Sequence, residues 1–225
     1  MHTNKRRSSA SAWVLFGLII ATGSLLTRDA NGQVRESSAR TPTKLSATGP
    51  SAVLAGGCFW GVDAVFKHVK GVTSVISGYA GGTRESAQYE TVSTGTTGHA
   101  ESVKITYDPS RISYLELLKI FFFVAHNPTE LNRQGPDEGT QYRSVIFYES
   151  AEQQNIAKSY IKQLNHDKAF TAPIVTQVVP LKGFYPAEEY HQNYLERNPE
   201  NPYIVFNDMP KLDQLRKQFP AFYTP

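Results

Sequence analysis

The sequence predicts a protein of the α+β class, a two-layer α/β sandwich with a ferredoxin-like β-α-β-β-α-β core and a C-terminal extension. Two observations support this fold class. Short apolar, β-branched runs alternate with segments whose apolar residues recur at helical spacing, and the first six segments follow that order. Glycine and proline separate the segments, which is typical of the connections within one domain.

The first four elements follow from the spacing of apolar residues. A strand over 51–55 is ended by two glycines, and a helix follows in which four apolar residues recur at i, i+3, i+4 and i+7: Val62, Val65, Phe66 and Val69. Gly71 ends this helix. Two further strands are predicted over 72–80 and 99–107, the second ended by an Asp-Pro pair.

The next helix, over 114–125, carries a start signal as well as an apolar face. Ser113 precedes it and Glu116 stands three residues later, which predicts a capping box. A strand over 141–148 completes the six-element core. A long helix over 150–166, a strand over 174–180 and a helix over 187–197 are predicted to follow.

The N-terminus has the order of a secretory signal peptide. A basic run ends at Arg7, an apolar stretch covers 12–26, and small residues suited to cleavage follow at 30–32. We therefore expect residues 1–32 to direct export, to the periplasm or the medium. The alternative is an uncleaved N-terminal anchor, although the stretch is short of the roughly 20 residues of a membrane span.

The basic character of the chain belongs to this segment. The whole chain has 23 basic and 20 acidic residues, and residues 1–32 hold four of the former and one of the latter. Residues 33–225 therefore carry 19 of each and are neutral, which gives no electrostatic case for binding nucleic acid. Residues 33–50 are polar and predict a flexible linker, and 51–225 predict a single domain, expected to act as a monomer.

Cys58 is the only cysteine and the main functional candidate. It stands between Gly57 and Phe59, where a predicted strand gives way to a helix. Backbone N–H groups and the positive end of the helix dipole would lower the pKa of such a thiol and favour the thiolate. A buried cysteine acting as a small hydrophobic residue is the alternative. An unpaired thiol in an exported chain favours the nucleophile.

Three other residues could complete a site around this thiol. Phe59 and Trp60 are either core aromatics or the walls of a small apolar pocket, and such rings make favourable contacts with a methyl group bonded to sulfur. Glu101 is either a solvated carboxylate or, if it faces inward near Cys58, an acid whose pKa is raised by burial.

The histidines leave a second enzyme class open and give no metal site. His99 could serve Cys58 as the base of a Cys-His hydrolase or acyltransferase. One cysteine and scattered histidines do not provide zinc spacing, so no metal is expected. Glu188 and His191 form a single E-x-x-H pair, which is interpreted as a helix surface because a di-iron site needs two such pairs.

Six blocks of sequence together point to a known family. They are GGCFWG, GYAGG, YETVSTGTTGHAE, YDPS, GTQYRS and FYPAEEYHQNYL, in this order. From about residue 51 to 220 the chain resembles the A-type peptide-methionine (S)-S-oxide reductases. The resemblance implies thiol-dependent reduction of methionine (S)-sulfoxide, free or in proteins, and thereby the repair of oxidised proteins.

The resemblance also implies the roles of seven residues. Cys58 matches the nucleophile, which becomes a sulfenic acid, and Glu101 matches the acid that protonates the sulfoxide oxygen. The remaining five match substrate-binding positions: Phe59 and Trp60 for the methyl group, Tyr89 and Tyr142 for the oxygen, and Asp137 for ordering the site and its water.

The chain departs from many members of the family at its C-terminus. Those members carry further cysteines that resolve the sulfenic acid, whereas residues 198–225 contain none. The resemblance therefore implies no bound cofactor and an external thiol reductant, such as glutathione, a glutaredoxin, a thioredoxin-like protein or another dithiol. A non-enzymatic module that binds peptides in an aromatic groove is the remaining alternative.

Overall fold

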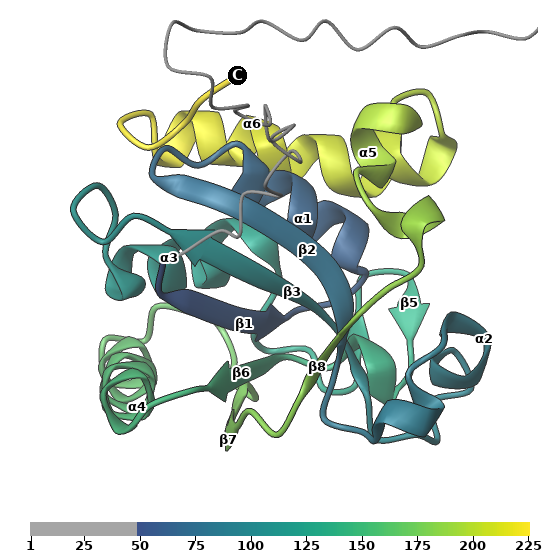
Figure 1. The fold of residues 1–225 in the computed structure, drawn as a ribbon. Helices are drawn as coiled ribbons and strands as arrows, with labels where there is room; N and C mark the ends of the chain where they lie inside the picture. The colour runs from purple at the N-terminus through teal and green to yellow at the C-terminus, as the bar shows by residue number, and fades with distance from the viewer. Residues whose placement is uncertain (1–48) are drawn as a thin grey trace, which may run out of the picture. The chain divides into compact units, whose positions relative to one another are not determined.

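A single six-stranded sheet organises the described part of the chain. The computed structural model describes residues 49–225, so the predicted signal peptide and most of the predicted linker lie outside it. The strands have the order β7-β6-β1-β3-β2-β8 (Figure 1). Their bounds are β1 Ser51–Ala55, β2 Val72–Ala80, β3 Ala100–Tyr107, β6 Val145–Tyr148, β7 Gln177–Pro180 and β8 Phe184–Pro186.

The four central strands confirm the predicted core. β1 pairs antiparallel with both β3 and β6, and β3 pairs antiparallel with β2, with Tyr79 opposite Glu101. Strand β1 thus lies between the third and fourth strands of the core, the arrangement of a split β-α-β fold. β7 adds in parallel to β6 and β8 adds antiparallel to β2, so the C-terminal extension widens the sheet at both edges.

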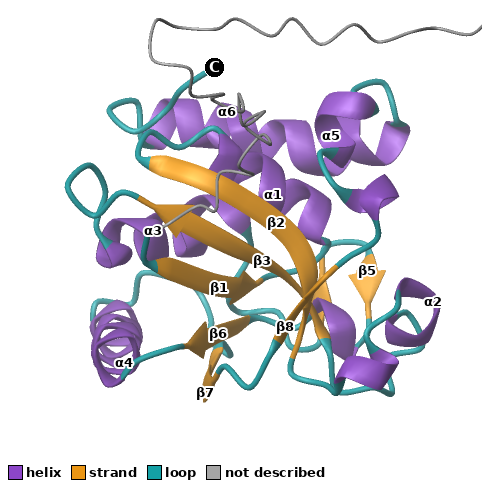
Figure 2. Ribbon diagram, in the orientation of Figure 1, coloured by secondary structure: helices purple, strands orange, loops and turns teal. Residues whose placement is uncertain are grey.

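Helices cover one face of this sheet. Their bounds are α1 Phe59–Lys67, α2 Tyr89–Val92, α3 Tyr114–Ile120, α4 Ala151–His166, α5 Tyr194–Arg197 and α6 Met209–Gln218. The main core lies between the sheet and α1, α3 and α6 (Figure 2). Alternate residues of β1 face opposite ways, since Leu54 joins this core while Val53 joins a small apolar cluster on the other face, with Phe184 packed against it.

Several predicted boundaries are confirmed and others move. The capping box of α3 is present, because the Ser113 side chain accepts from the Glu116 N–H while the Glu116 carboxylate accepts from the Ser113 N–H. Residues 121–125 continue α3 as a π-helical turn. The strands predicted from 141 and 174 begin later, at Val145 and Gln177.

The prediction of a continuous helix over 187–197 is wrong. The segment forms a 3₁₀ turn over Glu189–His191 and the short α5, separated by Asn193, whose φ of 55° lies in the left-handed region. The side chain of Gln192 bonds to the backbone of Ser77 on β2, at 3.0 and 2.9 Å. These long-range contacts outweigh the helical pattern of apolar residues.

Several elements have no counterpart in the sequence analysis. They are the 3₁₀ turn over Arg84–Ser86, α2, β8, the short hairpin of β4 (Arg133–Gln134) and β5 (Asp137–Glu138), and the C-terminal pair of a π-helical turn over Ile204–Asp208 and α6. Helix α6 packs beside α1, so the end of the chain lies against the segment that carries Cys58 (Figure 1). Between residues 49 and 225, none of the helices has the length and apolar character that crossing a membrane requires.

Candidate active site

Cys58 is the N-cap residue of α1, as the sequence predicts. The turn before it needs both glycines. Gly57 has a φ of +89°, and a Cβ there would lie 2.5 Å from Gln134 Cγ. A Cβ on Gly56 would lie 2.8 Å from the ring of His126. Close packing from two other segments therefore fixes where β1 ends and where the thiol stands.

The seven predicted site residues meet in one cavity of about 200 Å³. Its lining is Cys58, Phe59, Trp60, Tyr89, Glu101, Asp137, Tyr142 and Tyr203. These residues come from α1, α2, β3, β5, the 3₁₀ turn over Thr140–Tyr142 and the C-terminal segment. Tyr203 is the one member that the sequence analysis missed.

Glu101 faces inward from β3. Its side chain is buried, and one carboxylate oxygen accepts the backbone N–H of Phe59 at 3.0 Å. Burial raises the pKa of this carboxyl to about 8, with a smaller contribution from the negative charge of Asp137. The predicted direction is confirmed, and at neutral pH Glu101 holds a proton beside Cys58.

The thiol of Cys58 differs from the expectation. The backbone N–H of Trp60 and the ammonium of Lys211 do lower its pKa, but burial raises the pKa by more, and the carboxyls of Glu101 and Asp208 add to the rise. The pKa of Cys58 is thus well above its ordinary value. The predicted lowering of this pKa is wrong, because the helix end acts on a thiol that is only 8% exposed.

The tyrosines of the cavity are hydrogen-bond donors. Burial raises the pKa values of Tyr89 and Tyr142, so both phenols stay protonated. The Tyr203 hydroxyl donates to the Asp137 carboxylate. Burial also raises the pKa of Asp137, and the bond from Tyr203 opposes that rise. This pair forms part of the cavity wall.

The aromatic wall is held by residues from the C-terminal half. The indole of Trp60 stacks on Tyr194, with ring centroids 3.6 Å apart and planes within 6°. Its N–H donates to Nδ1 of His191 at 3.1 Å, and the His191 ring lies 5.0 Å from that of Phe59. Burial lowers the pKa of His191, which keeps the imidazole neutral and Nδ1 free to accept.

Glu188 and His191 do not form a helix surface, which corrects the sequence interpretation. His191 is buried. The carboxylate of Glu188 accepts the Tyr79 hydroxyl at 2.8 Å and the backbone N–H of Tyr89 at 2.9 Å. Both residues therefore position parts of the cavity wall, Trp60 through His191 and Tyr89 through Glu188.

His99 is not placed to serve Cys58 as a base. Its Nδ1 accepts the N–H of Gly82 at 3.2 Å, and its Nε2 lies 2.9 Å from the carbonyl oxygen of Thr83, to which it donates. The residues lining the cavity, within the described range, include no histidine. The geometry that a Cys-His hydrolase requires is therefore not found around Cys58.

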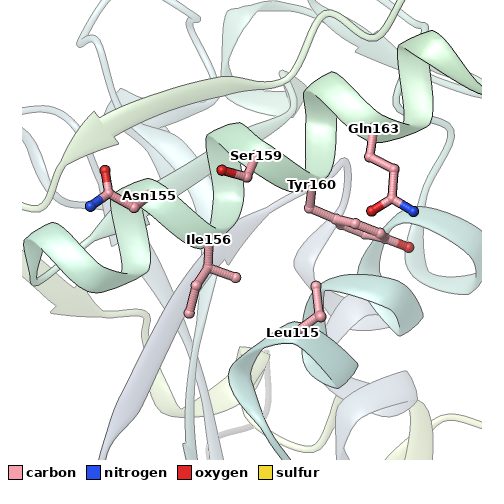
Figure 3. A pocket seen from close by; sticks show the side chains of 6 residues that line it. All are labelled: Leu115, Asn155, Ile156, Ser159, Tyr160 and Gln163. Carbon is pink, nitrogen blue, oxygen red and sulfur yellow. The ribbon is translucent and has the colours of Figure 1, made fainter.

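A larger hollow lies elsewhere and has no such chemistry. It holds about 340 Å³ between α3 and α4 and is lined by Leu115, Asn155, Ile156, Ser159, Tyr160 and Gln163 (Figure 3). It contains neither a carboxyl group nor a thiol. The chemistry of the lining, rather than the size of the cavity, identifies the site at Cys58.

Comparison with known proteins decides the family. The family model described as peptide methionine sulfoxide reductase matches residues 50–222. The chain belongs to this family. As a peptide methionine sulfoxide reductase it is an enzyme, and it performs thiol-dependent reduction of methionine sulfoxide, a reaction that repairs oxidised proteins. The predicted family and activity are thereby confirmed.

Individual relatives cover most of the chain. The peptide methionine sulfoxide reductase MsrA 2 of Mesorhizobium japonicum is 60% identical over 174 residues, which are 77% of this chain and 89% of the relative. MsrA 2 of a Synechocystis strain is 49% identical over 205 residues, 90% and 96% of the two chains. These relatives carry the same enzyme name.

Solved structures support the fold. Mxr1 of Saccharomyces cerevisiae in reduced form matches with a TM-score of 0.62 and 36% identity, covering 68% of this chain and 87% of that one. Methionine sulfoxide reductase A of Corynebacterium diphtheriae matches with a TM-score of 0.59 and 34% identity, covering 67% and 76%. The fold class predicted from the sequence is confirmed.

Proposed function

We propose that the enzyme reduces the (S) epimer of methionine sulfoxide, with Cys58 as the nucleophile and Glu101 as the proton donor. One observation carries the proposal: the only thiol of the chain shares a cavity with a buried carboxyl whose pKa of about 8 keeps it protonated at neutral pH. A sulfoxide needs both groups, because its sulfur accepts a nucleophile readily only when its oxygen is protonated or strongly hydrogen-bonded.

The cavity matches the two ends of the sulfoxide group. The methyl group contacts the faces of Phe59 and Trp60, where aromatic rings favour carbon bonded to sulfur. The oxygen lies against Glu101, Tyr89 and Tyr142, three groups that can donate in their protonated forms. Asp137, held by Tyr203, orders the polar side of the site and its water.

The oxidation step then balances without a cofactor. Glu101 gives its proton to the sulfoxide oxygen while the sulfur of Cys58 attacks the sulfoxide sulfur and forms an S–S bond, and the thiol proton replaces the one that Glu101 has given. The oxygen then passes to the sulfur of Cys58, where an S–O bond forms, and both the S–O bond of the substrate and the S–S bond break. Methionine leaves, reduced by two electrons, and Cys58 becomes a sulfenic acid. The pKa values of thiol and acid, both raised, place both protons where this step uses them.

Regeneration requires thiols from outside the chain. The sequence holds no second cysteine, so no internal disulfide can form. One external thiolate attacks the sulfenic sulfur and gives a mixed disulfide and water. A second thiol then releases Cys58 as a thiol and leaves the reductant as a disulfide. Glutathione, a glutaredoxin, a thioredoxin-like protein or another dithiol can supply these two thiols.

A single-turnover experiment tests the reaction. Reduced enzyme is mixed with methionine (S)-sulfoxide in the absence of reductant, and methionine is counted per enzyme. We expect one methionine per chain, a sulfenic acid on Cys58 trapped by dimedone, no product from the (R) epimer and none from Cys58→Ser. If the wild-type chain also fails to turn over the (S) epimer with excess dithiothreitol, the proposal is wrong.

We also propose that residues 1–32 export the enzyme, which rests on the basic, apolar and small-residue order of that segment. Intact-mass measurement on the protein from a periplasmic or culture fraction tests this. A mass that starts near residue 33 supports cleavage, and a full-length mass in the membrane fraction supports an anchor. Recovery of the full-length chain only from the cytosol would contradict export.

A further inference from the structure

Cys58 lines a second cavity besides the one that receives the sulfoxide. This reductant cavity has a volume of about 150 Å³. Asp137 and Tyr203 line both cavities, so the hydrogen-bonded pair stands where they meet. Beyond Cys58, the second cavity is walled by the β4–β5 turn around Gly135 and by the C-terminal segment that carries Lys211.

Lys211 brings a positive charge to the helix end that carries the thiol. A Cβ on Gly61 would lie 2.6 Å from Lys211 Nζ and 2.0 Å from Asp208 Oδ1. The ammonium thus lies against the first turn of α1, three residues beyond Cys58. It donates to Asp208 Oδ1 at 3.0 Å, which uses one of its three N–H bonds.

The two charges of this pair are not equally accessible. Asp208 is fully buried and does not line the reductant cavity, whereas the Lys211 side chain is 18% exposed and does. Lys211 is the one cationic side chain among the described residues that line it. A group entering the cavity therefore meets the ammonium, with Asp137 as the nearest acidic side chain on the wall.

The geometry of the second step favours this cavity as the entry of the reductant. In the proposed reaction the oxygen of the sulfenic acid comes from the sulfoxide and faces Glu101, Tyr89 and Tyr142, where donors can help it leave. Displacement at sulfur is in line, so the attacking sulfur has to approach from the side opposite that oxygen. Among the described residues, the reductant cavity is a second hollow that Cys58 lines, apart from the one that receives the oxygen.

We propose that the reductant cavity admits the external thiol that regenerates Cys58, and that this thiol is a small molecule bearing a carboxylate. The ammonium of Lys211 attracts this negatively charged molecule and positions its sulfur, as the thiolate, for attack on Cys58. The volume of the reductant cavity, about 150 Å³, suits a small thiol with one acidic group better than a protein loop. The thiolate forms an S–S bond with Cys58, the S–O bond breaks, and the hydroxyl group takes a proton from Glu101 and leaves as water. Cys58 ends in a mixed disulfide.

This inference rests on the proposed function. A two-stage experiment with thiols of negative, neutral and positive charge distinguishes a failure of the inference from a failure of the proposed function. Enzyme is first oxidised with one equivalent of methionine (S)-sulfoxide, and the methionine formed is measured. The sulfenic acid is then mixed with 3-mercaptopropionate, 2-mercaptoethanol, cysteamine or glutathione, and its loss is followed by dimedone quenching and mass spectrometry. Absence of methionine would contradict the proposed function, whereas stoichiometric methionine leaves the thiol series to test this inference alone.

The variants isolate the charge of Lys211. In Lys211→Met the buried Asp208 loses its partner, so the double variant Asp208→Asn/Lys211→Met removes both charges and Lys211→Arg keeps them. Lys67→Met is the matched control for Lys211→Met, and Asp63→Asn/Lys67→Met is the matched control for the double variant. The Lys67 side chain provides the match for the following reason. Its ammonium also pairs with a buried aspartate, Asp63, at 2.6 Å and is also 18% exposed, but it lines neither cavity at Cys58.

The results are compared as the rate constant for loss of the sulfenic acid in the wild type divided by that in the variant. Because the same thiol is used in both measurements, its intrinsic reactivity cancels from this ratio. For the double variant we expect a ratio of about five for 3-mercaptopropionate and glutathione, about two for 2-mercaptoethanol, and one or less for cysteamine. High salt should shrink these differences, because it screens a partly exposed charge. Lys211→Arg and Lys67→Met should give ratios near one throughout.

Three results would overturn the inference. The first is an equal ratio for the anionic, neutral and cationic thiols, and the second is the same charge dependence in the Lys67 control variants. The third is that all small thiols react slowly while a thioredoxin supplied as the dithiol reacts much faster, with no effect of the double variant, because the reductant is then a protein that the cavity does not select.

Discussion

The two sides of the sulfoxide cavity are held in place in different ways. Glu101 stands on β3, a central strand paired on both sides, and its position follows from sheet register. Trp60 stands on α1 and is oriented by two residues about 130 positions away, His191 and Tyr194. The acidic side is therefore fixed by backbone pairing and the aromatic side by packing of side chains. Changes on the first side should reduce the rate of chemistry, and changes on the second should reduce substrate affinity.

The largest effect is expected from Glu101→Gln. The amide can accept the Phe59 N–H but cannot give up a proton, so kcat should fall on the order of 100-fold, within the usual range for acid catalysis. The wild-type rate should also fall as pH rises above about 8, where the carboxyl of Glu101 ionises, and the variant should lose this alkaline limb. A pH profile of kcat for both proteins provides the measurement. A near-wild-type rate would contradict the role of Glu101.

The same substitution should change stability with pH. The pKa of Glu101 is raised from 4.5 to about 8 by folding, so the unfolded chain ionises first and wild-type stability declines as pH rises from about 4.5 to 8. Glu101→Gln escapes this loss. The difference in unfolding free energy between the variant and the wild type should therefore grow in favour of the variant as the pH rises. Between pH 4.5 and pH 8 this difference should increase by on the order of 3 kcal/mol.

Urea unfolding at the two pH values measures this difference. Glu200→Gln is the control, because it makes the same change of a carboxyl to an amide at an exposed position. Parallel stability curves for Glu101→Gln and the wild type would show that the carboxyl is not desolvated in the folded protein.

On the aromatic side, Trp60→Ala should raise KM for a methionine sulfoxide peptide about tenfold and lower kcat less. The expected size follows from losing the contact of one methyl group and one sulfur with the ring. Tyr194→Leu removes the stack behind Trp60 but no wall of the cavity, so it should raise KM by a smaller factor. If both variants lowered kcat and left KM unchanged, the two sides would not differ as described.

Fluorescence gives an independent reading of the same wall. The sequence has only two tryptophans, and Trp13 lies within the predicted signal peptide. In a chain that starts near residue 33, Trp60 is the sole indole. Binding of the sulfoxide to the Cys58→Ser variant should therefore change its emission.

The smallest effect is expected from Tyr203→Phe. The change removes the hydroxyl that donates to Asp137 and lets the pKa of Asp137 rise further, since that bond lowers it. We expect kcat to fall about threefold, the scale of one modest hydrogen bond. Tyr223→Phe, in the same C-terminal segment but outside the cavity, should retain full activity. An equal loss in both variants would indicate a general effect on packing.

The sequence predicted most of the core because local patterns determine it. The strands of the split β-α-β unit follow apolar runs, and the start of α3 follows a capping box, both of which depend on near neighbours in the chain. The segment over 187–197 did not follow its pattern. The contacts of Gln192 with Ser77 join residues far apart in the sequence, and no local signal contains them.

The site was predicted from the motif blocks and from the loop just before GTQYRS, which holds Asp137, and residues beyond the last block were missed. Tyr203 and Lys211 lie beyond the last block, in the C-terminal segment. Helix α6 did leave a signal, because Leu212, Leu215 and Phe219 recur at helical spacing and pack on the core. The pKa of Cys58 could not be predicted, since the helix end is visible in the sequence but the burial of the thiol is not.

The contact between Gly61 and the Asp208–Lys211 pair has a consequence for how the enzyme is made. The reactive thiol belongs to the first helix of the domain, and the groups that pack against that helix belong to the last. During synthesis, 152 residues (59–210) follow Cys58 before Lys211 is added to the chain. Until then the thiol lacks its C-terminal cover, so oxidants and other thiols can reach it without the selection that the finished site provides. The interval between making the first helix and docking the last one is the period in which a partner that shields free thiols would protect this enzyme most.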